Sequence, residues 1–181
     1  DFYSIPGQKW LLGPDETGAL YIRKSLIPVV EPSRVGLGVT AEDVFDQEGG
    51  FVPEMGIEKL AASTRSAPLK AGFLEAVRFV QAVGLGEIEA RNLSLASSLK
   101  AGLSPLPGVR VISPMEGPGA SGLVSFTVEG VEPKAAAEAL WSGSRILVRS
   151  VTYPACVRAS THFFNTDDEV ETLVEAVREL G

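Results

Sequence analysis

Three side-chain types in this chain could form a covalent bond or bind an anion, and Lys9 comes first. It lies between Gln8 and Trp10, directly after a short apolar stretch and a Pro-Gly turn. Apolar neighbours would desolvate its ammonium group, and desolvation favours the neutral amine that can attack a carbonyl. On composition alone the alternative, a solvated surface lysine, is the commoner case.

Arginine supplies the second type of candidate. A planar guanidinium can hold a carboxylate through two parallel hydrogen bonds, and Arg158 lies in the alternating segment CVRAS. An arginine on the exposed face of an edge strand would show the same pattern, so both interpretations stay open. Arg149, at the end of RILVR, is a further candidate that equally fits a plain surface charge.

The third candidate is a hydroxyl in the segment LAASTRSAPL, where Ser63, Thr64 and Arg65 precede a helix expected to start near Pro68. A hydroxyl and backbone amides before a helix start suit an anion. The alternative is a polar loop that only caps the helix.

Hydrophobic periodicity predicts the elements that must position these side chains. The opening segment and the later ALYI predict two short strands joined by turns. Residues 27–56, rich in Pro and Gly, predict a long surface loop. Apolar spacings of three and four predict helices over 69–83 and 87–103.

After residue 106 the pattern is that of a small α+β layer domain. Four strands are expected in VRVIS, GLVSFTV, RILVRSV and CVRASTHFF. An Ala-rich helix has Pro133 in its first turn, and Thr166 with Glu169 predicts a capping box at the start of the last helix.

The composition limits the class of protein. The chain has 181 residues, 45% apolar and 22% charged, as in ordinary globular domains. Its formal charge of −7 disfavours nucleic acid and anionic membranes as partners, because counterion release needs clustered basic residues. One cysteine and one histidine argue against a structural zinc site and for a reducing compartment, so we expect a cytoplasmic location and no metal.

Two segments resemble one enzyme family. The run GQKWLLGPDETGALYIR is similar to the cofactor-lysine segment of class V aminotransferases, which are fold-type I pyridoxal phosphate enzymes. The tail CVRASTHFFNTDDEVETLVEAV is similar to the closing strand and helix of that family. Within the family, RSVTYPACVRASTHFF most resembles the cysteine or cystine C-S lyases and the isopenicillin N epimerase-like members.

The resemblance covers essentially the whole chain and implies an α/β fold from the carboxy-terminal part of such an enzyme. Residues 1–85 would be the remnant of the large cofactor-binding domain with its long loop. Residues 86–181 would be an interdomain helix and a small α+β C-terminal domain. The resemblance also implies a homodimer.

The same resemblance implies roles for single residues. Lys9 would hold pyridoxal 5'-phosphate as a Schiff base and then move protons. Gln8 stands where many members carry His beside the cofactor phosphate, and Thr64 matches the threonine that reaches the partner subunit's phosphate. Arg158 matches the arginine that binds the substrate α-carboxylate. Pro6 departs from the usual Ser or Thr and supplies no donor.

Two residues invite a functional interpretation that we do not favour. Cys156 does not match the sulfur-accepting cysteine of a desulfurase, which lies in a longer loop well upstream of the matching arginine. We expect Cys156 to be buried in a strand, where a thiol is more often inert than reactive. His162 is predicted to be a structural strand residue, and Asn165 with Thr166 predicts the start of a helix.

These features predict a pyridoxal phosphate enzyme that acts on a small-molecule substrate, an amino acid. Beta-elimination at a C-S bond is favoured over transamination from the tail resemblance, and epimerisation stays open. The family's other cofactor contacts lie upstream of the cofactor lysine, and only eight residues precede Lys9, so the chain alone is expected to be inactive. The alternative is a noncatalytic domain that binds a carboxylate ligand or a partner chain.

Overall fold

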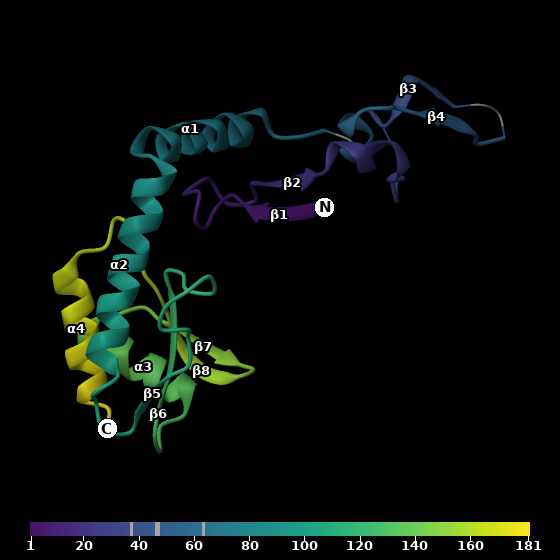
Figure 1. Ribbon diagram of the computed structural model, residues 1–181. Helices are drawn as coiled ribbons and strands as arrows, with labels where there is room; N and C mark the ends of the chain where they lie inside the picture. The colour runs from purple at the N-terminus through teal and green to yellow at the C-terminus, as the bar shows by residue number, and fades with distance from the viewer. Residues whose placement is uncertain (37, 46–47, 63) are drawn as a thin grey trace. The chain divides into compact units, whose positions relative to one another are not determined.

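The computed structural model describes residues 1–36, 38–45, 48–62 and 64–181, which form two compact units (Figure 1). The first unit is Asp1–Ala82 and the second is Val83–Gly181. Each unit has its own strands and its own buried residues.

The first unit opens with an antiparallel hairpin. β1 (Phe2–Pro6) pairs with β2 (Gly18–Ile22), and Pro6 lies opposite Gly18 at the end of the ladder. Proline is tolerated at that place because it does not interrupt the hydrogen bonds of a strand interior. The two short strands predicted here are confirmed, and Lys9 lies in the connection between them.

The prediction of one long loop over residues 27–56 is wrong in part. The segment contains a second antiparallel pair, β3 (Thr40–Phe45) and β4 (Phe51–Pro53), with a register shift between the strands. Short 3-10 helices flank it, η1 (Lys24–Val29) and η2 (Ile57–Leu60). The Pro and Gly residues lie mostly between these elements, which are too short to show a sustained hydrophobic period.

The predicted helix at the end of the first unit is confirmed as α1 (Ala67–Val83). Its apolar residues recur at spacings of three and four, and Val80 is 3% exposed. Phe73 lies on this helix and is half-buried.

The second unit contains a four-stranded antiparallel sheet in the order β5-β6-β8-β7. β8 therefore lies between β6 and β7, although it comes last in the chain. The four predicted strands are confirmed, each shorter than the predicted segment. Their bounds are β5 (Val109–Val111), β6 (Leu123–Val128), β7 (Arg149–Thr152) and β8 (Ala155–Ser160).

Three helices cover one face of this sheet (Figure 1). They are α2 (Leu85–Leu103), α3 (Pro133–Ser144) and α4 (Asp167–Arg178). Pro133 occupies the first turn of α3, as predicted, where its missing N–H costs nothing. α2 and α4 pack side by side.

The core lies between these helices and alternate residues of β6 and β8. Phe126 and Val124 point from the sheet into this core, and Leu95 and Leu99 of α2 meet them, all with 0% exposure. Burying each such side chain stabilises the fold by about 1.5–3 kcal/mol. The opposite face of the sheet carries Arg158 and other polar residues, so the core fixes which way Arg158 points.

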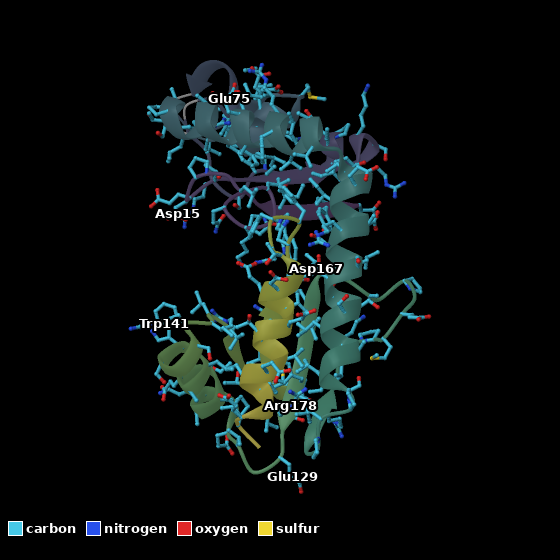
Figure 2. All side chains as sticks on the ribbon, turned by 90° about the vertical axis from the view of Figure 1, so that its left-hand side faces the viewer. Asp15, Glu75, Glu129, Trp141, Asp167 and Arg178 are labelled. Carbon is cyan, nitrogen blue, oxygen red and sulfur yellow. The ribbon has the colours of Figure 1, made fainter. Side chains whose placement is uncertain are left out.

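The start of α4 is held by the predicted capping box. The Glu169 amide donates to Thr166 Oγ1 at 3.2 Å, and the Thr166 amide donates to Glu169 Oε2 at 3.0 Å. Hydrogen bonds from the Asn165 side chain and the Thr166 backbone lower the pKa of Glu169 below its ordinary value of 4.5. Arg91 of α2 ion-pairs with Asp167 at 3.0 Å, at the beginning of α4 (Figure 2).

Across the described ranges, no helix combines the length and apolarity that crossing a membrane requires. Nor does this part of the chain gather three or more His, Cys, Asp or Glu side chains around a possible metal ion.

Candidate active site

Lys9 lies in a compact turn that connects β1 to β2. The Gly7 amide donates to the Thr17 carbonyl and the Gly13 amide donates to the Gly7 carbonyl, both at 2.8 Å. The Leu12 amide donates to the carbonyl of Lys9 at 3.0 Å, with Leu12 in the left-handed region at φ 57°. Backbone hydrogen bonds thus close the turn on both sides of Lys9, so the backbone that carries the lysine is fixed.

The Lys9 side chain itself is exposed. The apolar surroundings expected for it are not formed by the described residues of this chain. Trp10, its neighbour in sequence, is 38% exposed. The structure therefore presents an exposed primary amine on a hydrogen-bonded turn, and no described residue of this chain encloses it.

The residues beside Lys9 differ in what they offer to a phosphate. Gln8 is exposed, and its side-chain amide can donate a hydrogen bond. Pro6 ends β1 and has neither a side-chain donor nor an N–H. The donor that the family pattern usually has at position 6 is therefore missing.

Thr64 is exposed and precedes the first residue of α1, Ala67, by three positions. Ser66 Oγ accepts a hydrogen bond from the amide of Leu69 at 3.4 Å, and Arg65 donates to the carbonyl of Ala61. The helix-capping contact thus belongs to Ser66, which leaves the Thr64 hydroxyl available for a ligand. Ser63, named with Thr64 from the sequence, lies outside the described residues.

Arg158 lies on β8, inside the sheet. The interpretation of an exposed edge-strand arginine is therefore wrong, because β6 and β7 flank β8 on its two sides. The Arg158 side chain is half-buried, and its Nε is buried without a hydrogen-bond partner among the described residues. A buried donor without a partner costs about 1–3 kcal/mol, which a bound acceptor would recover.

A second arginine lies directly across the ladder from Arg158. Arg149 on β7 is its register partner, and like charges opposite each other destabilise a sheet. No ion pair within the described residues includes either guanidinium. An anion bound by both would remove this repulsion, which supports Arg149 as the second carboxylate candidate over a plain surface charge.

Both arginines line a groove of about 800 Å³, to which residues of α3 and of the segment before β7 also contribute. Trp141, which is 47% exposed and projects from α3 (Figure 2), forms an apolar part of its wall. Ser150 and Ser160 add hydroxyl groups. Sequence reasoning missed Trp141, because its periodicity on the helix gives no sign of which strand lies beside it.

His162 has a structural role, although the predicted strand position is wrong. β8 ends at Ser160, and His162 lies in the turn that follows. Its Nδ1 accepts a hydrogen bond from the Phe163 amide at 2.8 Å, and its ring stacks on Phe164 at 5.0 Å. The Asn165 side chain accepts from the His162 amide at 2.9 Å, so this turn leads directly into the capping box.

Cys156 lies in β8 as predicted and is 2% exposed. The connection before it is short, because β7 ends at Thr152 and β8 begins at Ala155. Only Tyr153 and Pro154 form the turn, so there is no longer loop here to carry a reactive cysteine.

Lys9, Gln8 and Thr64 belong to the first unit and Arg158 to the second. Both sets of residues lie within the range of the chain that a comparison against protein families matches. The model of the aminotransferase class-V family matches residues 1–173. The chain belongs to this family. Members of the class V aminotransferase family use pyridoxal phosphate.

Curated relatives of this chain include a probable cysteine desulfurase 2 of Mycobacterium leprae, 32% identical over 187 residues. That alignment covers 98% of the chain and 44% of the relative. Isopenicillin N epimerase of Amycolatopsis lactamdurans is 31% identical over 188 residues, which are 100% of the chain and 47% of the epimerase. The chain thus spans about half the length of the curated relatives it matches.

Solved structures agree with the fold. The apo cysteine desulfurase of Thermococcus onnurineus NA1 superimposes with a TM-score of 0.88 at 31% identity, over 99% of this chain and 46% of that one. The cystine C-S lyase C-DES, solved with its product cysteine persulfide, gives 0.85 at 27% identity over 99% and 46%. The chain therefore has the mixed α/β fold of the carboxy-terminal part of a fold-type I enzyme.

Proposed function

We propose that this chain supplies the cofactor lysine and the substrate arginine of a pyridoxal phosphate enzyme that acts on an amino acid. The observation that carries the proposal is the buried, unpartnered Nε of Arg158, with Arg149 opposite it. A carboxylate satisfies both features, because a guanidinium fork matches its two oxygens.

Lys9 is the residue proposed to hold the cofactor as a Schiff base. Pyridoxal phosphate, when bound, supplies an electron sink that makes the α-proton of an amino acid removable. In an elimination, the Lys9 amine would take that proton and supply one to the departing sulfur. Gln8 and Thr64 are proposed to donate hydrogen bonds to the cofactor phosphate, with no contribution from Pro6.

Beta-elimination at a C-S bond is the reaction we favour over transamination and epimerisation. The likeness to the cystine C-S lyase C-DES supports it. In such a reaction the carboxylate is held by Arg158 while Lys9 moves the proton. The sulfur-bearing product then leaves directly, without transfer to a protein thiol.

The position of the one cysteine in this chain is what separates this proposal from a desulfurase reaction. Several relatives are named as cysteine desulfurases, among them that of Mycobacterium leprae. In this chain the single cysteine is Cys156, which is buried in a central strand behind a two-residue turn. A buried thiol cannot approach a substrate sulfur without local unfolding.

Further proposals concern the domains, the location and the oligomeric state of the whole protein. We propose that residues 1–85 belong to the cofactor-binding domain and 86–181 to the small C-terminal domain, that the enzyme is a cytoplasmic homodimer, and that this segment alone is inactive. The partner subunit's phosphate would then be the one that Thr64 reaches.

Product analysis of the full-length protein tests the reaction. With pyridoxal phosphate and cystine or cysteine, elimination predicts a 2-oxo acid and ammonia in equal amounts without an added amino acceptor. Product that forms only when an oxo-acid acceptor is added would instead establish transamination. An amino acid that binds through Arg158 without any pyridoxal phosphate uptake would support the noncatalytic binding domain.

A further inference from the structure

The turn that carries Lys9 is packed tightly against α1. An added Cβ at Gly7 would lie 2.7 Å from Cε2 of Phe73, and one at Gly13 would lie 2.8 Å from Cδ2 of the same ring. Real Cβ atoms essentially never make contacts this short, so both positions need glycine for space. The ring of Phe73 therefore lies against both ends of the segment that contains Lys9.

Two further contacts brace the same turn. Thr17 Oγ1 donates to the carbonyl of Pro14 at 2.6 Å, and it also fills the space beside Gly7, where an added Cβ would approach it to 2.5 Å. On α1, a Cβ at Gly72 would lie 2.8 Å from Cγ of Pro14. Consecutive residues of the helix thus contact the turn, while hydrogen bonds close it from within.

We propose that Phe73, assisted by Thr17, is a positioning residue for the Lys9 amine. This inference rests on the proposed function of Lys9. The lysine side chain is a flexible four-carbon stem, so the place of its amine depends on how firmly the backbone beneath it is held. The Phe73 ring holds that backbone at Gly7 and Gly13.

The expected effect follows from the geometry of covalent attachment. The amine must come within about 3–3.5 Å of the cofactor carbonyl carbon, and a displacement of about 1 Å can cost on the order of 100-fold in rate. Removing the Phe73 ring would free the turn to adopt several positions. The rate of cofactor attachment would then fall by more than the loss of folding stability explains.

The test uses the full-length protein stripped of cofactor, with pyridoxal phosphate added back. The rate of Schiff-base formation at Lys9 is followed by absorbance, together with the pH midpoint of the absorbance band. Phe73→Ala is expected to slow attachment roughly tenfold and to shift the midpoint. Phe73→Leu, which keeps an apolar side chain against the glycines, is expected to recover most of the rate.

Val80→Ala is the matched control, because Val80 is buried on the same helix two turns from Phe73. It should lower the thermal midpoint without slowing attachment. Thr17→Val serves if Phe73→Ala does not fold: it keeps the shape and removes only the hydrogen bond to Pro14. It is expected to slow attachment to a smaller degree.

The outcomes separate this inference from the proposed function. Failure of the unaltered protein to attach the cofactor at Lys9 would contradict both the proposed function and the positioning role of Phe73. Normal attachment by the unaltered protein and an unchanged rate in Phe73→Ala, or in a folded Thr17→Val, would overturn the positioning role alone. Equal slowing in Val80→Ala would show that lost stability is the cause, and would also overturn it.

Discussion

The buried Nε of Arg158 has no hydrogen-bond partner among the described residues. The sheet fixes its direction, because its neighbours Val157 and Ala159 point into the core and alternation sends Arg158 to the other face. Its register partner Arg149 adds a second positive charge instead of a carboxylate. Glu138 also lines this groove, but the described residues form no ion pair with either arginine, so an anionic ligand would satisfy both guanidinium groups.

Replacement of Arg158 by lysine in the full-length protein is expected to weaken amino-acid binding about 10- to 100-fold, because the charge remains but the paired hydrogen bonds are lost. Cofactor content should not change. The measurement is a titration of substrate against the cofactor absorbance. Arg110→Gln, an exposed position on β5, is the control and should bind normally. Unaltered substrate affinity in Arg158→Lys would remove Arg158 from the site.

Cys156→Ala tests whether the Cys156 thiol takes part in the reaction. Because Cys156 is buried in β8, we expect a small loss of stability and retention of most of the turnover. Turnover and the urea midpoint are measured on the same preparation. A folded variant without activity would mean that the thiol takes part in the reaction.

The elements differ in how far the sequence predicted them. Local sequence signals predicted α3 and α4: Pro133 in the first turn of α3, and the Thr166–Glu169 capping box of α4. Such signals involve residues close in sequence, so a single sequence reveals them. β3 and β4 were not predicted, because they are too short to show a hydrophobic period. The contact of Phe73 with Gly7 and the pairing of Arg149 with Arg158 depend on tertiary packing and strand register, which no local pattern contains.

The start of α4 has a pH dependence that follows from its capping box. The folded state lowers the pKa of Glu169, so the carboxylate's contribution to stability is complete above its ordinary value of 4.5 and is lost as the pH falls through the lowered value. Glu169→Ala should therefore unfold at lower urea than the unaltered protein near neutral pH. The gap should close in acid.

Glu171→Ala is the control for that measurement, because Glu171 is an exposed carboxylate on the same helix outside the box. The difference in urea midpoint between Glu171→Ala and the unaltered protein should change less with pH. A Glu169→Ala gap that widens toward acid would contradict the assignment of the ionised carboxylate as the stabilising form.

At the scale of the whole molecule, the proposed chemistry is divided between the two units. The Lys9 amine and the proposed phosphate donors belong to Asp1–Ala82, and the arginines proposed to bind the carboxylate belong to Val83–Gly181. The packing of the Lys9 turn against α1 positions the amine, and the pairing of β7 with β8 positions the two arginines. Lys9 variants should accordingly lose covalent cofactor attachment, whereas Arg158 variants should lose substrate binding alone.

Borohydride reduction of the full-length protein in the presence of pyridoxal phosphate, followed by peptide mapping, tests the central claim most directly. We predict stable label on the peptide that contains Lys9, and its absence after Lys9→Ala. Label confined to any other lysine, or none at all on a folded protein, would contradict the assignment of Lys9 as the cofactor residue.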